Sequence, residues 1–175
     1  MSNPDLPVPA IDHQAALSDY DRYIEEVSIE SVTDALDLVK PSRIGHGVRA
    51  IEDAGLTARI AGEGIVLEVC PTSNIRTAVY PGYAAHPLNR LRAAGCAVTL
   101  NSDDPPYFAT TLGGEYGIAA EAFGWGEEDL RNATVTALEA GFLDDETRAR
   151  LRRVTSAGSP AAGRPNGGHG PGSGH

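Results

Sequence analysis

The chain reads Ile65-Val66-Leu67-Glu68-Val69-Cys70 and then Pro71-Thr72-Ser73-Asn74, an apolar run closed by a polar turn that begins with proline. The run is too apolar for a strand with one face in water, so it predicts a strand buried on both faces, as in a parallel sheet. Helical patterns flank it, one through Leu56 and Ile60, the other opened by His86-Pro87. Helices that alternate with buried strands predict parallel strands joined by helical crossovers.

The helix–strand pattern continues on both sides of this strand. Upstream, the sequence predicts an amphipathic helix that stops at Lys40-Pro41 and a short strand at Arg43-Ile44-Gly45-His46-Gly47. Downstream, it predicts a strand at Ala97-Val98-Thr99-Leu100. Three further helical segments follow, over about 111–123, 127–140 and 144–154. The predicted fold class is therefore α/β, with about three parallel strands and their helices.

Composition limits the class of partner and the compartment. A net charge of -10 argues against nucleic acid, which is bound by clustered cations. The two cysteines, Cys70 and Cys96, lie in apolar runs and are interpreted as core residues rather than as a disulfide framework. No stretch approaches the length of a membrane span, and the first residues are acidic and proline-rich, unlike a signal peptide. These features predict a cytoplasmic protein with no membrane partner.

Both ends of the chain lie outside the repeating pattern. Residues 1–28 are predicted to be a separate or poorly ordered segment, in which four apolar residues recur at helical spacing: Leu17, Tyr20, Ile24 and Val27. Residues 155–175 are predicted to be a disordered tail rich in Gly, Pro and Ser, which includes His169 and His175.

Polar side chains follow all three predicted strands at their carboxyl ends. They are His46, the Thr72-Ser73-Asn74 turn and the pair Asp103-Asp104. In parallel β/α folds the loops at this end of the sheet build the active site. Two adjacent carboxylates at the mouth of a buried strand are costly unless a cation or a protic group faces them. A divalent metal and a nitrogen-rich substrate would meet that need, while the plain alternative is a strand followed by an Asp-Pro turn.

Four motifs, in matching order and spacing, resemble the adenosine deaminase family. They are Ser42-Arg43-Ile44-Gly45-His46-Gly47, Leu67-Glu68-Val69-Cys70-Pro71-Thr72-Ser73-Asn74, His86-Pro87-Leu88 and Thr99-Leu100-Asn101-Ser102-Asp103-Asp104-Pro105. The resemblance covers residues 29–154 and implies the C-terminal part of a metal-dependent (β/α)8 barrel, from its sixth strand onward. It further implies zinc-dependent hydrolysis of adenosine to inosine and ammonia, with adenine or another aminopurine as the alternative substrate.

The resemblance also implies roles for three residues. His46 matches the family histidine that orients and deprotonates the metal-bound water, and Asp103 matches an aspartate that ligates zinc. Asp104 matches the aspartate that hydrogen-bonds a purine ring nitrogen. A bound metal lowers the pKa of water to about 7, which makes a nucleophile at neutral pH. The segment Thr110-Thr111-Leu112, followed by Glu115-Tyr116, looks more like the members that act on nucleosides.

Other polar residues receive structural interpretations. Glu68 lies in an apolar strand and must be paired if buried, with Arg43 as the candidate partner. His86, before Pro87, is explained better by capping or packing than by metal binding. Ser73 and Asn74 are expected to fix their loop, and Glu115-Tyr116 is expected to be structural.

The sequence also departs from the family. Family members take two zinc ligands from a His-x-His and a third from a His-x-x-Glu, and this chain contains neither. Counting back from His46 places Arg22 and Glu25 at the second motif, but the helical spacing there argues that the match of Glu25 is coincidental. Asp103 alone cannot hold zinc usefully, because catalytic sites take about three protein ligands.

The expected protein is therefore a truncated or split homologue, inactive alone. Its expected partners are a purine nucleoside or base and a chain that supplies the missing strands. The alternative is a non-catalytic fragment or pseudoenzyme that acts only through partner binding.

Overall fold

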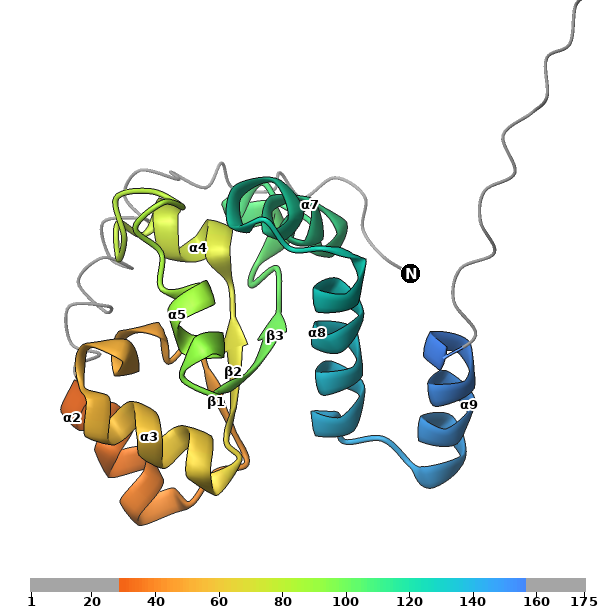
Figure 1. Ribbon diagram of the computed structural model, residues 1–175, viewed down its shortest axis with the longest axis horizontal. Coiled ribbons are helices and arrows are strands. Elements are labelled where there is room, and N and C mark those ends of the chain that lie inside the picture. Colours follow the sequence, from red (N-terminus) through yellow and green to blue (C-terminus); the bar gives the residue numbers. More distant parts are fainter. Residues whose placement is uncertain (1–28, 157–175) are drawn as a thin grey trace, which may run out of the picture.

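Three short parallel strands form the sheet of the computed structural model, which describes residues 29–156. They are β1 (Arg43–Gly45), β2 (Val66–Val69) and β3 (Ala97–Leu100), in the order β1-β2-β3. Leu67 of the central strand pairs with Ile44 on one side and with Val98 on the other. The predicted parallel sheet with helical crossovers is confirmed, and the arrows lie side by side in Figure 1.

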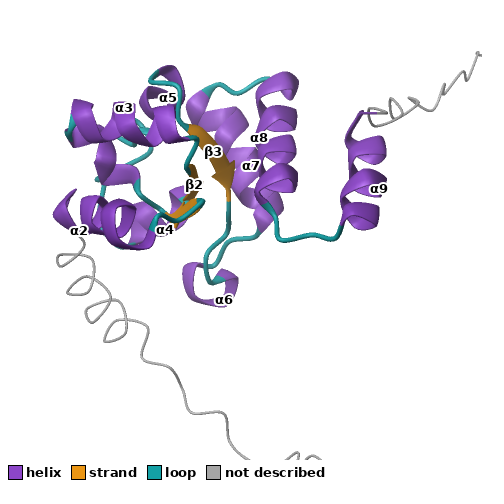
Figure 2. Ribbon diagram, turned by 90° about the horizontal axis from the view of Figure 1, so that it is seen from below, coloured by secondary structure: helices purple, strands orange, loops and turns teal. Residues whose placement is uncertain are grey.

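Helices precede and follow each strand. Before β2 the chain forms α2 (Ile29–Asp34), the π-helical turn η1 (Ala35–Val39), the 3-10 turn η2 (Val48–Glu52) and α3 (Ala54–Glu63). Between β2 and β3 lie α4 (Pro71–Arg76) and α5 (Leu88–Ala93). After β3 come α6 (Pro105–Phe108), α7 (Leu112–Phe123), α8 (Glu127–Ala140) and α9 (Asp145–Ser156). Figure 2 shows the helices arranged around the small sheet.

Local sequence signals set several helix boundaries. The Asp53 side chain accepts a hydrogen bond from the Leu56 amide at 2.8 Å and so caps the start of α3. Gly64 ends that helix in the left-handed region, with φ +69°. Thr111 caps α7 by accepting from the Gly114 amide at 3.0 Å.

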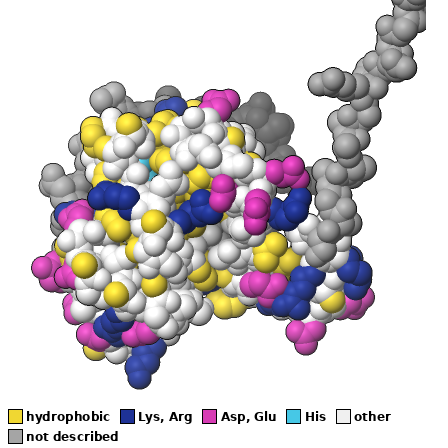
Figure 3. All heavy atoms as spheres, in the orientation of Figure 1, with side chains coloured by type: hydrophobic (Ala, Val, Ile, Leu, Met, Phe, Trp, Pro, Cys, Tyr) yellow, Lys and Arg dark blue, Asp and Glu magenta, His cyan; other side chains and the backbone are white. Residues whose placement is uncertain are grey.

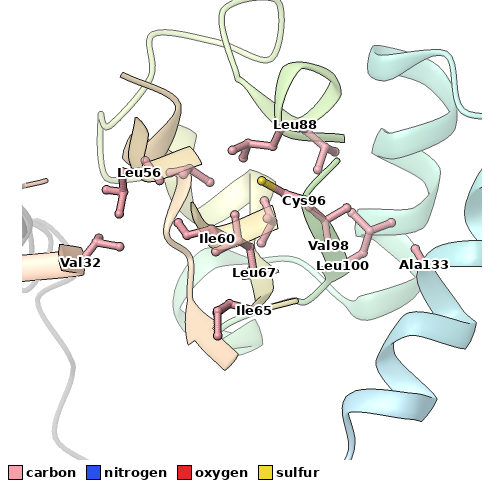
Figure 4. Packing of buried hydrophobic residues seen from close by; sticks show 14 of the residues in the cluster. Val32, Leu56, Ile60, Ile65, Leu67, Leu88, Cys96, Val98, Leu100 and Ala133 are labelled. Carbon is pink, nitrogen blue, oxygen red and sulfur yellow. The ribbon is translucent and has the colours of Figure 1, made fainter. Parts of the chain in front are cut away.

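The core lies around the central strand, as its apolar sequence predicted. Leu67 and Val69 of β2 are fully buried, and so are Ile60 of α3 and Leu88 of α5. Figure 4 shows Ile60, Leu67 and Leu88 directed toward the same interior. Burying each such side chain contributes about 1.5–3 kcal/mol, so the core holds the strand ends in place.

The C-terminal helices pack against the sheet in sequence. Helix α8 lies beside β3, where Ala133 is buried, and α9 lies beyond α8 (Figure 1). The Arg148 guanidinium of α9 donates to the carbonyl oxygens of Leu138 at 2.7 Å and Gly141 at 2.8 Å. A cation at these carbonyls satisfies the end of α8.

The structure differs from the predicted elements in a few places. Residues Pro71–Asn74, predicted as a turn, open helix α4, because a proline at the first helical position is preorganised for a helix. The short η2 and α6 were not predicted. Helix α9 includes Thr155 and Ser156, the first two residues of the predicted tail. The predicted helix before residue 28, with Arg22 and Glu25, and the histidines His169 and His175 lie outside the described residues.

Two further predictions concern the cysteines and the membrane. Cys70 and Cys96 are buried free thiols, which confirms that they are core residues. In the described part of the chain, none of the helices has both the length and the apolar character that a membrane crossing requires.

Candidate active site

His46 and Asp103 lie at the carboxyl ends of β1 and β3, and both adopt a left-handed backbone. His46 has φ +57° and Asp103 has φ +54°. Such angles are uncommon for residues other than glycine and cost about 1–2 kcal/mol. Next to His46, Gly47 is also left-handed, and a Cβ there would lie 2.7 Å from the Leu67 side chain. Lys40, Ala78 and Ala109 are left-handed as well, so this backbone angle fixes the direction of the two side chains but does not by itself mark a functional site.

The structure brings these two side chains together. The His46 Nε2 atom lies 3.5 Å from Oδ2 of Asp103. The buried Ser73 hydroxyl of α4 donates to the same oxygen at 2.7 Å. Both contacts use Oδ2, which leaves Oδ1 of Asp103 able to bind a cation.

Cys70, at the end of β2, adds its sulfur to this group. Ligand atoms of His46, Cys70 and Asp103 all lie within 4.8 Å of one another. Burial raises the pKa of the Cys70 thiol to about 12, so it is protonated at neutral pH without a metal. The interpretation of Cys70 as a core residue is confirmed by its burial, but no pattern in the sequence indicated that its sulfur lies near His46 and Asp103.

A cavity of about 400 Å³ opens above the three strand ends. Its lining includes Gly45, His46, Glu68, Cys70, Asn101 and Asp103. Cavities of this size are typical of small-molecule sites. Asp104, the predicted substrate ligand, is exposed at the start of α6, and it is not among the lining residues.

The electrostatic setting keeps His46 neutral at pH 7. Burial lowers the pKa of its imidazole, and the charges of Asp103 and Glu68 oppose that shift only in part. A neutral imidazole beside a carboxylate can exchange hydrogen bonds with a water molecule in the cavity.

Glu68 and Glu115, two of the polar residues with structural interpretations, are placed as predicted. Glu68 pairs with Arg43, whose Nη1 lies 2.7 Å from Oε1. Glu115 is fully buried and accepts from the Thr72 amide at 3.1 Å and the Thr110 hydroxyl at 2.6 Å. It thereby ties α4 to α7.

Two residues expected only to fix their loop contact the site directly. Ser73 holds Asp103, and the Asn74 amide lies 3.2 Å from Nδ1 of His46. Their position after a strand indicated that they lie near the site. The predicted turn did not indicate that their side chains would point toward Asp103 and His46, because it did not include helix α4.

The donor chemistry fits zinc, although the described residues provide only part of a site. Carboxylate, imidazole and thiolate are all zinc ligands, and catalytic zinc sites take about three from protein. The resemblance assigns His46 to the reacting water and not to the metal. Among the described residues, the candidate metal ligands are then Asp103, as predicted, and the nearby Cys70. These three residues are thus a group that could hold part of a metal site.

The buried His86 should make the fold acid-sensitive. Burial lowers the pKa of His86 to about 4, whereas it is about 6.5 in an unfolded chain. Below about pH 6.5 the unfolded chain binds more protons, so the free energy of unfolding falls until about pH 4, by about 3 kcal/mol in all. Urea unfolding at about pH 7 and about pH 4.5 measures this loss.

The variant His86→Gln separates this contribution from that of the acidic groups. It keeps a donor but cannot titrate, so about 2–3 kcal/mol of the acid-induced loss should disappear. Equal losses in the variant and the parent chain would show that His86 does not resist protonation.

Comparisons with known proteins bear on the family and the fold. The family model described as adenosine deaminase matches residues 24–156. An adenine deaminase from Agrobacterium fabrum is 60% identical over 122 residues, which cover 70% of this chain and 38% of that protein. The chain thus spans less than half the length of this curated relative.

Solved structures show the same partial correspondence. The crystal structure of an adenine deaminase from Arthrobacter aurescens superposes with a TM-score of 0.72 at 30% identity, covering 76% of this chain and 41% of that one. An amidohydrolase from Burkholderia ambifaria, solved with bound Zn, gives a TM-score of 0.68 at 26% identity and covers 75% of this chain and 37% of that one. The three-stranded sheet and its helices therefore match part of a barrel.

Proposed function

Because this chain belongs to the adenosine deaminase family, we propose that it forms one wall of an adenine deaminase site, which hydrolyses the exocyclic amino group of adenine to give hypoxanthine and ammonia. The observation that carries the proposal is the convergence of His46 and Asp103, which lie 3.5 Å apart and both line the cavity. Two strained loops and the Ser73 hydroxyl hold them there.

We propose adenine, the alternative substrate that the resemblance implied, rather than adenosine. The relative at 60% identity and the solved structure at 30% identity are both adenine deaminases. The segment Thr110-Thr111-Leu112, which looked like that of nucleoside deaminases, also makes structural contacts. The Thr110 hydroxyl donates to Glu115, and Thr111 caps α7, so these contacts explain the segment without a ribose.

Three residues of this chain would have separate roles in the proposed reaction. Asp103 would hold zinc through the oxygen that Ser73 does not engage, and the bound metal would make water nucleophilic near pH 7. His46 would orient that water against the amino-bearing carbon of the purine. Asp104, exposed beside the cavity, would hydrogen-bond a ring nitrogen of the base.

We further propose that polypeptide outside these 175 residues supplies the remaining strands and zinc ligands. The described sheet has three strands, whereas the relatives that it matches are much longer. Large apolar side chains are exposed on the described part of the chain: Leu38 is 82% exposed, Val39 72% and Phe142 85%. On the face that Figure 3 shows, acidic and basic side chains are interspersed, unlike the clustered cations of a nucleic-acid-binding surface.

Substrate choice can be measured in a hybrid enzyme. The hybrid combines this chain with the part of the Agrobacterium fabrum adenine deaminase outside the 122 matched residues. We expect kcat/KM for adenine to exceed that for adenosine by more than about 10-fold, the lower end of the discrimination that pocket contacts give between related substrates. Equal or better turnover of adenosine would contradict the proposed substrate.

A further inference from the structure

The hydrogen bonds behind His46 run in a single direction, which begins at a backbone amide. The Leu88 amide lies 3.3 Å from Nδ1 of His86. A backbone amide can only donate, so Nδ1 of His86 accepts. Since burial lowers the pKa of His86 to about 4, the ring is neutral at pH 7 and its one proton is on Nε2.

That proton fixes the orientation of Asn74. The Nε2 atom of His86 lies 3.1 Å from Oδ1 of Asn74 and donates to it. The other end of the amide, Nδ2, lies 3.2 Å from Nδ1 of His46. An amide NH₂ group can only donate, so Nδ1 of His46 accepts, and the proton of neutral His46 is on Nε2.

The surroundings prevent this chain of bonds from reversing. Turning the Asn74 amide over would set its NH₂ against the Nε2–H of His86, two donors face to face. Asn74 is 3% exposed and His86 5%, so water cannot compensate. The His86 ring packs edge-on against Tyr80 and Phe123, with centroids 5.3 Å and 5.5 Å away.

We propose that His86 and Asn74 are positioning residues that fix His46 in the tautomer with its proton on Nε2, the atom that faces Asp103. Neutral His46 therefore presents a donor to the cavity, not a lone pair. In the proposed deaminase, on which this consequence rests, His46 holds the attacking water through its oxygen. With its proton on Nε2, His46 orients the water as a hydrogen-bond donor and does not act as the base at that atom.

The tautomer can be measured on the 175-residue chain itself, with no substrate and no metal. Ring ¹⁵N shifts of His46 are recorded at about pH 8, where histidine is neutral. Assignment uses the signals that disappear in His46→Asn. We expect a pyridine-like shift at Nδ1 and a pyrrole-like shift at Nε2. The opposite pattern, or averaged shifts that indicate a mixture, would overturn the proposal.

Substitutions at the two positioning residues test the direction of the relay. Asn74→Asp replaces the donor by an acceptor, so the proton should move and Nδ1 should become pyrrole-like. His86→Gln keeps a donor toward Asn74 and should preserve the parent pattern, whereas His86→Phe should give averaged shifts. As a matched control, Asn132→Asp adds the same charge at an exposed position of α8 and should change nothing. Unchanged His46 shifts in Asn74→Asp would overturn the proposal.

This experiment is independent of the proposed function. The shifts report the tautomer whether or not any purine is turned over, and the parent chain decides the question even if a variant does not fold. Conversely, the hybrid could deaminate adenine while His46 carried its proton on Nδ1. The two failures are therefore distinguishable.

Discussion

Asp103→Asn should remove zinc and deaminase activity from the hybrid enzyme. The amide has nearly the same shape and tolerates the left-handed backbone at φ +54°, so the loop should keep its conformation. It loses the negative charge that a divalent cation requires. We expect zinc content to fall and kcat/KM for adenine to decrease by more than the roughly 10- to 100-fold that loss of an outer-shell partner costs.

The neighbouring carboxylate is the matched control for this substitution. Asp104→Asn removes the same charge one residue further along, at an exposed position. It should raise KM for adenine while zinc content, measured by atomic absorption, stays at the parent level. Full zinc content in the Asp103→Asn hybrid would show that this aspartate is not a metal ligand.

His46→Asn should leave zinc bound but reduce turnover strongly. Asparagine also tolerates φ +57°, so the β1 loop should survive the change. The shorter side chain cannot reach the water that the imidazole orients. We expect kcat to fall by about 10²–10⁴-fold, the range for loss of a positioned proton-transfer or hydrogen-bonding group. Steady-state kinetics together with zinc analysis measure both effects, and a kcat within a few-fold of the parent would contradict the role of His46.

The strands could be predicted because their sequence signals are strong and local. The predicted strand at 97–100 coincides with β3, and the predicted strand at 65–70 contains β2. Long helices such as α7 and α8 lie within a residue or so of their predicted bounds, since several turns of apolar periodicity define them. Parallel strands then place His46 and Asp103 at one edge, which the structure confirms.

The rest of the site depends on contacts that a local pattern does not encode. Helices α4 and α6 have six and four residues, too few for periodicity to reveal them. The contact between Asn74 and His46 joins residues 28 positions apart, and its direction depends on the Leu88 amide behind His86. The sequence analysis explained His86 by packing, which agrees with its burial. It did not predict the tautomer that we propose His86 imposes on His46 through Asn74.

Deamination of adenine by this chain, alone and in the hybrid, tests the central claim most directly. Both samples receive zinc, and hypoxanthine is quantified by chromatography. In the proposed site His46 and Asp103 form only one wall, so we predict no turnover above background by the chain alone and clear turnover by the hybrid. Turnover by the chain alone would contradict the claim, and an inactive but assembled hybrid would favour a non-catalytic role.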